Sequence, residues 1–131
     1  MTRILLDTHL LLWAVAEPRK LPPGARRRIE EADIFVSAAS LWEVSIKAAL
    51  GKLAADPAEL LAEIQPAGFT LLPITGEHAA AVAKLPAVHA DPFDRMLVAQ
   101  AKTEPLLLLT NHAVLAGYGD CVELVAVKPR R

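Results

Sequence analysis

Short runs of branched aliphatic residues alternate along the chain with longer stretches in which apolar residues recur every three or four positions. The short runs lack a polar alternation, which is typical of strands buried on both faces. The longer stretches predict amphipathic helices. We expect strands at residues 4–6, 34–36, 69–74, 106–109 and 122–125, and helices at residues 10–16, 25–32, 38–50, 57–65, 75–85, 92–101 and 113–117.

The order of these elements favours an α/β fold. Strands separated by helices usually pair in a parallel sheet that carries helices on both faces. Right-handed crossovers then bring the carboxyl ends of several strands to one edge, where open α/β sheets bind their ligands. Pro73 lacks the amide hydrogen that a central strand needs, so the strand at residues 69–74 is expected at a sheet edge.

Composition narrows the function classes. The 131 residues are enough for one domain with a hydrophobic core, and no stretch reads as a linker. Hydrophobic residues make up 53% of the chain, which suggests that some surface is buried against a partner or a second copy. With a net charge of −1, contact with nucleic acid has to depend on local patches. The single cysteine, Cys121, excludes an intramolecular disulfide and fits a reducing cytosol.

No stretch predicts a secretory signal or a membrane span. The apolar segment at residues 10–16 is too short to cross a bilayer, and Asp7 and His9 precede it. We therefore expect a cytoplasmic protein without a membrane partner. The basic segment at residues 128–131 is expected to be mobile.

Three acidic residues could reach the same edge of the sheet. Asp7 directly follows the first predicted strand, and Glu43 and Asp94 lie in what we expect to be the first turns of two helices. Structural roles are open to two of them as well. Asp7 can cap the helix that follows it, Ser40 and Glu43 match a capping box, and Lys47 is placed for an ion pair with Glu43.

A second pair of acids opens the helix predicted at residues 92–101. Asp91 followed by Pro92 is a favourable helix start, because proline suits the first helical position and the helix dipole favours acids there. Asp94 is three positions after Asp91, so the two share a face. One cap is enough for a helix, which leaves one of these acids available for chemistry.

Charge repulsion indicates what converging acids require. Two carboxylates about 4 Å apart repel by roughly 4 kcal/mol at an effective dielectric constant near 20. Three such groups must become protonated or share a cation. Oxygen ligands favour Mg²⁺ or Mn²⁺, and no Cys/His spacing fits a tetrahedral zinc site. Such a cation activates water and stabilises charge during phosphoryl transfer.

Four segments resemble the PIN-domain ribonucleases, and in particular the VapC-type toxins of bacterial toxin–antitoxin pairs. They contain the Leu-Leu-Asp-Thr-His run after the first strand, the Ser-Ala-Ala-Ser-Leu-Trp-Glu run, the Leu-Gly-Lys-Leu turn and the Asp-Pro-Phe-Asp-Arg helix start. The resemblance extends from about residue 3 to about residue 125. The segments are residues 5–9, 37–43, 46–53 and 91–101.

The resemblance implies a single PIN domain at residues 1–131, built as a three-layer α/β/α sandwich with a central, mostly parallel sheet. It also implies RNA cleavage with Mg²⁺ or Mn²⁺ held by clustered acids. Carried over by position, the metal-binding and catalytic acids are Asp7, Glu43 and Asp94. Asp91 corresponds to an accessory acid or a helix cap, and Thr110 to a hydroxyl residue near the metal.

The chain departs from the family pattern at one acid. Similar members carry an aspartate two residues after the threonine, and this chain has His112. A neutral imidazole lowers the negative charge of the site by one, so we expect weaker Mg²⁺ binding and a shift toward Mn²⁺. Loss of a second metal or of activity, and a His112 side chain that only faces solvent, remain open alternatives.

The leading hypothesis is a metal-dependent endoribonuclease that acts as the toxin of a toxin–antitoxin pair. The alternative is a catalytically weakened module that still binds an antitoxin, with His112 as its motivation. A haloacid-dehalogenase-like phosphatase is disfavoured, because His9 stands where that class needs a second aspartate. A dinucleotide-binding fold is disfavoured by the absence of a glycine-rich turn.

The expected partners are an RNA substrate, a cognate antitoxin and a second copy of the chain. The family implies the antitoxin and a side chain of it inserted near the acids. The apolar excess adds to this, because we expect Leu10, Leu11, Trp13 and Trp42 near helix surfaces, where they can form a dimer interface and a groove for an antitoxin helix.

Overall fold

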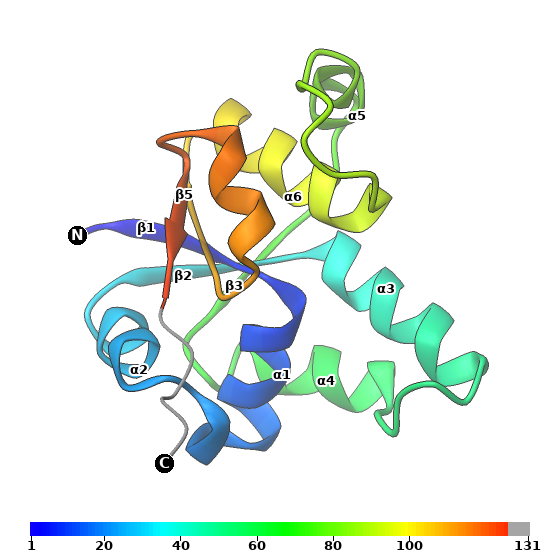
Figure 1. Cartoon of the computed structure of the whole chain (residues 1–131). Coiled ribbons are helices and arrows are strands. Elements are labelled where there is room, and N and C mark those ends of the chain that lie inside the picture. Colours follow the sequence, from blue (N-terminus) through cyan, green and yellow to red (C-terminus); the bar gives the residue numbers. More distant parts are fainter. Residues whose placement is uncertain (126–131) are drawn as a thin grey trace.

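The computed structural model describes residues 1–125, so the predictions for the tail at residues 128–131 lie outside it. Within the described residues a five-stranded, fully parallel sheet has the order β3-β2-β1-β4-β5 (Figure 1). Each predicted strand is present, and the strand that precedes Pro73 lies at an edge, as expected. The strands are β1 (Arg3–Leu6), β2 (Asp33–Ser37), β3 (Thr70–Leu72), β4 (Leu107–Thr110) and β5 (Val122–Leu124).

Helices cover both faces of the sheet, which confirms the predicted three-layer sandwich (Figure 1). Successive residues of β1 alternate between the two faces, with Ile4 and Leu6 in one core and Leu5 in the other. Helices α1, α2 and α4 contribute to the first core, and α6 with η2 to the second. The helices are α1 (Thr8–Ala16), η1 (Pro18–Lys20), α2 (Pro23–Glu30), α3 (Ala38–Ala49), α4 (Pro57–Ile64), α5 (Gly76–Val82), α6 (Pro92–Thr103) and η2 (Ala113–Tyr118).

Helix α3 starts at the predicted residue 38, but its cap differs from the predicted one. Its N-cap is Ser37, whose side chain accepts a hydrogen bond from the backbone amide of Ala39 at 2.9 Å, so Ser40 is not a cap. The predicted capping box between Ser40 and Glu43 is therefore wrong, and Glu43 lies in the second turn. The physical reason is that β2 ends at Ser37 and runs directly into α3, so the cap stands three residues before Ser40.

Replacement of Ser37 by alanine is expected to lower the free energy of unfolding by about 1 kcal/mol, the typical cost of losing a helix N-cap. Ser37 is fully buried, so water cannot replace the lost acceptor. Chemical denaturation followed by circular dichroism measures this change. An unchanged free energy of unfolding would contradict the assignment of Ser37 as the cap.

The prediction that four apolar side chains lie near helix surfaces is partly wrong. Leu10 and Leu11 are fully buried in the core, because α1 follows β1 immediately and packs between the sheet, α3 and α4. Trp13 is half-buried against the same core. Trp42 on α3 is 59% exposed, so it alone of the four is a largely exposed surface residue.

The carboxyl edge of the sheet positions the candidate site. Asp7 follows β1, Thr110 ends β4, and α3 begins directly after β2. The N-terminal turn of α6 approaches the same edge next to α3 (Figure 1). No helix within residues 1–125 is both long enough and apolar enough to cross a membrane.

Candidate active site

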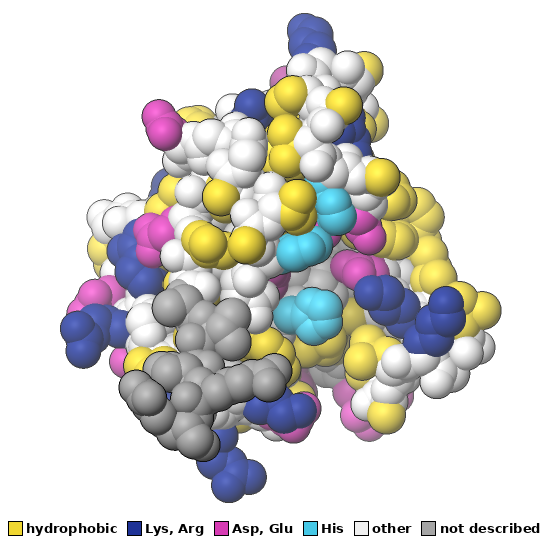
Figure 2. Space-filling model, viewed as in Figure 1, with side chains coloured by type: hydrophobic (Ala, Val, Ile, Leu, Met, Phe, Trp, Pro, Cys, Tyr) yellow, Lys and Arg dark blue, Asp and Glu magenta, His cyan; other side chains and the backbone are white. Residues whose placement is uncertain are grey.

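A cleft of about 280 Å³ lies at this edge and collects most of the predicted site residues. Asp7, Glu43, Asp91, Asp94 and His112 all line it, although they come from four separate parts of the chain. Figure 2 shows histidine and acidic side chains gathered around the hollow at the centre of this face. The other lining residues are Thr8, His9, Lys47 and His89.

Asp7 serves as a helix cap and as a wall of the cleft, so both of its predicted roles are compatible. Its Oδ1 accepts a hydrogen bond from the amide of Leu10 at 2.8 Å, and its Oδ2 accepts one from the hydroxyl of Thr110. Thr110 is fully buried beneath the cleft and thereby fixes the carboxylate. Burial raises the pKa of Asp7 above its ordinary value, and the hydrogen bond from Thr110 opposes that rise.

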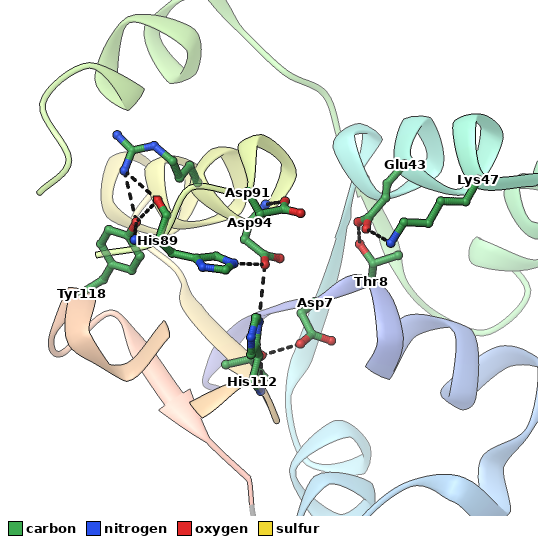
Figure 3. Close-up of polar contacts among 11 residues, drawn as sticks. Asp7, Thr8, Glu43, Lys47, His89, Asp91, Asp94, His112 and Tyr118 are labelled. Carbon is green, nitrogen blue, oxygen red and sulfur yellow. Dashed lines mark hydrogen bonds and ion pairs between the residues drawn. The ribbon is translucent and has the colours of Figure 1, made fainter. Parts of the chain in front are cut away.

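Glu43 is held on the α3 side of the cleft (Figure 3). Lys47 Nζ donates to its Oε2 at 2.7 Å, which confirms the predicted ion pair, and the hydroxyl of Thr8 donates to its Oε1 at 2.8 Å. Thr8 also lies 2.9 Å from the buried hydroxyl of Ser40. The sequence reading did not single out Thr8 or Ser40 as partners of this acid, because they approach it only once α1 and α3 are packed.

Asp94 lies opposite, in the first turn of α6, and Asp91 is the N-cap of that helix, as predicted. The side chain of Asp91 accepts from the amide of Asp94 at 2.9 Å. The pKa of Asp94 is raised, first by burial and then by repulsion from the charges of Asp91 and Glu43. Negative charge is therefore concentrated on this side of the cleft.

Two histidines contact the same oxygen of Asp94 (Figure 3). His89 Nε2 is 3.1 Å from Asp94 Oδ2, and His112 Nδ1 is 3.5 Å from it. The two rings are edge-to-face, with centroids 5.0 Å apart. His112 is half-exposed but packs into the cleft, so the alternative that it only faces solvent is wrong.

The three predicted acids share the cleft but are not the tightest set of potential metal ligands. Among residues 1–125, the set whose ligand atoms all lie within 4.8 Å of one another is His89, Asp94 and His112. His89 was missed by sequence reasoning. Its nearness to Asp91 and Asp94 in the chain was the available signal, but its contact with Asp94 depends on the fold of the loop before α6.

The donor set fits a divalent cation. Carboxylates of Asp7, Asp91 and Asp94 face one small cleft, and the repulsion that raises the pKa of Asp94 is what a bound cation relieves. The positive charge of Lys47 is already paired with Glu43. The arrangement can thus hold a cation next to a phosphate group and orient a water molecule between fixed carboxylates.

Replacement of Asp7 by asparagine is expected to raise the Tm of the metal-free protein by several degrees at neutral pH. Because the pKa of Asp7 is raised in the folded state, its protonated form stabilises the fold at low pH, and this stability is lost as the pH rises through the raised value. Asparagine stays neutral and still caps α1.

Thermal unfolding of both proteins in a chelator, at a series of pH values, measures the difference in Tm. The difference should be small in acid and should grow toward neutral pH. A difference that does not change with pH would contradict the electrostatic origin of the effect.

Comparison with known proteins shows the family of the chain. The family model described as the PIN domain matches residues 4–117. Ribonuclease VapC22 of Mycobacterium tuberculosis is 45% identical over 42 residues, which are 32% of this chain and 32% of that protein. The matched part therefore spans about a third of the length of that curated relative.

Solved structures share the fold at low sequence identity. VapBC2 from Rickettsia felis, bound to a DNA fragment from its promoter, has a TM-score of 0.69 and 12% identity, with 97% of this chain and 100% of that chain covered. DNA-bound VapBC from Salmonella typhimurium has a TM-score of 0.68 and 19% identity, with 94% and 98% covered. The family model covers most of the chain, so the chain belongs to the PIN domain family.

Proposed function

We propose that the protein is a metal-dependent endoribonuclease and the toxin of a toxin–antitoxin pair. The observation that carries the proposal is that Asp7 and Asp94, which are far apart in the sequence, face one cleft at the carboxyl edge of a parallel sheet. Membership of the PIN domain family and similarity to Ribonuclease VapC22 support the same activity.

The acids of the cleft have distinct roles in this proposal. Asp7 and Asp94 hold Mg²⁺ or Mn²⁺, with Asp91 as an accessory acid. Such an ion, when bound, supplies an activated water at neutral pH and neutralises charge on the scissile phosphate. Thr110 and the amide of Leu10 keep the carboxylate of Asp7 in place.

Glu43 and Lys47 complete the proposed site from α3. Glu43 is fixed by Thr8 and Lys47, so its carboxylate can accept a hydrogen bond from the attacking water without changing its position. Lys47 is 42% exposed and reaches the rim, where its charge can contact a neighbouring phosphate of the RNA.

Incubation of the purified, tag-free protein with a structured RNA tests the activity. Cleavage is expected with Mg²⁺ or Mn²⁺ and not with EDTA, and Asp7→Asn should remove it. Equal cleavage by Asp7→Asn would rule out this mechanism. Tight antitoxin binding without cleavage by the wild type, under any metal condition, would favour the weakened binding module instead.

An apolar surface of this chain is the proposed docking site for the antitoxin. An apolar cleft of about 370 Å³ lies between α3, α5 and α6, and the largely exposed Trp42 packs edge-to-face on Phe93 at its border, with ring centroids 5.2 Å apart. The similar structures from Rickettsia felis and Salmonella typhimurium are VapBC complexes, which supports an antitoxin partner.

Co-expression with the product of the open reading frame immediately upstream tests this partnership. A stable complex that suppresses RNA cleavage is expected.

Size-exclusion chromatography with light scattering of the isolated chain tests the proposed homodimer, and a mass equal to one chain at micromolar concentration would contradict it. The cytoplasmic location stays a prediction.

A further inference from the structure

The set formed by His89, Asp94 and His112 has a ligand chemistry that the carboxylates elsewhere in the cleft do not share. Two imidazole nitrogens and one carboxylate oxygen lie within 4.8 Å of one another, on the loop before α6, the first turn of α6 and the loop after β4. Both nitrogens face the same oxygen, Asp94 Oδ2, and Figure 3 shows both rings directed at that carboxylate.

Nitrogen ligands change which cation is preferred. Mg²⁺ takes oxygen ligands almost exclusively, whereas imidazole suits Zn²⁺, Co²⁺ and related transition metals. Three protein ligands that leave further positions open are also the usual composition of an exchangeable or catalytic transition-metal site. We propose that His89, Asp94 and His112 form a binding site for a divalent transition metal of the zinc type, with higher affinity than the cleft has for Mg²⁺.

The backbone around His89 is fixed, as a metal ligand requires. The amide of His89 donates to the hydroxyl of Tyr118 at 3.1 Å, and the carbonyl of His89 accepts from the same hydroxyl at 3.3 Å and from Arg95 at 3.3 Å. Arg95 also donates to the carbonyls of Val82 and Pro86. The loop that carries His89 is therefore tied to α5, α6 and η2.

The set is accessible from the cleft. The side chain of His112 is 50% exposed and those of His89 and Asp94 are about a quarter and a fifth exposed. An ion can therefore enter without opening the core. Ordinary hydrogen bonding of the two rings to Asp94 is the competing explanation, and it predicts no selective metal binding.

The inference deepens the proposed function, on which its catalytic meaning rests, because Asp94 is common to both. An ion held by the two histidines occupies an oxygen that the Mg²⁺ or Mn²⁺ site also needs. The identity of the available cation would then regulate the cleft. Binding itself can be tested without RNA.

Titration of metal-stripped, tag-free protein with Co²⁺, followed by visible absorption, tests the site. We expect the visible absorption bands of Co²⁺ bound by nitrogen ligands, saturating at one Co²⁺ per chain. Zn²⁺ should displace the bound Co²⁺, whereas excess Mg²⁺ should not. His89→Ala and His112→Ala should each weaken Co²⁺ binding by about 100-fold, at or above the loss seen on removing groups that only orient a metal ligand.

His9→Ala is the matched control, because His9 lines the same cleft without belonging to the set. Thermal unfolding establishes that each variant is folded. Equal weakening by His9→Ala, or unchanged Co²⁺ binding in folded His89→Ala and His112→Ala, would overturn the proposal. If the histidine variants bind Co²⁺ normally but the wild type cleaves RNA with Mg²⁺, the metal-site proposal fails and the proposed function stands. If Co²⁺ binding depends on the histidines but no metal supports cleavage, the proposed function fails and the metal-site proposal stands.

Discussion

Replacement of Asp94 by asparagine is expected to reduce the rate of RNA cleavage by about 1000-fold or more, because a charged ligand that stabilises the transition state is lost. Asp94 is the acid that interacts with most of the other charged groups of the cleft. Its pKa is raised by burial and by the charges of Asp91 and Glu43, and both neighbouring histidines contact its Oδ2. Initial rates at saturating Mn²⁺ measure the loss.

Asp91→Asn is the matched control for Asp94→Asn. It removes the same charge from the same turn of α6, but asparagine can still accept the hydrogen bond from the amide of residue 94. We expect a loss of no more than about tenfold, which corresponds to an interaction of about one pKa unit with a half-buried neighbouring charge. A larger loss for Asp91→Asn than for Asp94→Asn would show that the two acids have been given the wrong roles.

Replacement of His112 by aspartate is expected to increase Mg²⁺-supported cleavage by about 10- to 100-fold, because Mg²⁺ binds oxygen ligands and gains little from imidazole. The backbone at this position is already held, since the amide of His112 donates to Thr110 Oγ1 at 3.0 Å. A new carboxylate there would also face Asp94 and would need the cation for stability. Cleavage rates measured across a series of Mg²⁺ concentrations report the change.

His9→Asp adds the same charge to the same cleft away from Asp94 and serves as the control. If the gain came only from total negative charge, both variants would show it. Unchanged or lower Mg²⁺-supported cleavage in folded His112→Asp would contradict the interpretation of His112 as a replaced metal ligand. A gain from an undetectable rate would show that the wild-type chain is the weakened form of the enzyme.

The arrangement of the fold followed from the sequence because its central strands, β1 and β4, are buried on both faces. Uninterrupted apolar runs such as the one in β1 identify a parallel sheet, and Pro73 identified the edge strand. The cap of α3 did not follow, since Ser37 and Ser40 are both reasonable caps and only the end of β2 selects between them. The burial of Leu10 and Leu11 depends on α3 and α4, which no local pattern reveals.

The candidate site followed only in part. Asp7, Asp91 and Asp94 lie at strand ends and helix starts, which can be predicted from the sequence. All three line one cleft. The contact between His89 and His112 joins residues 23 positions apart and depends on the loop that Tyr118 and Arg95 hold. Such convergence is a tertiary property, so composition and spacing could not show that two nitrogens face Asp94.

Anomalous X-ray scattering from crystals grown with Mn²⁺ is the most direct test of a cation at the edge of the sheet. We expect a Mn²⁺ ion inside the cleft, within coordination distance of a carboxylate oxygen of Asp94. An ordered cleft with no ion at saturating Mn²⁺, or an ion bound elsewhere while Asp94 keeps only its histidine contacts, would contradict it.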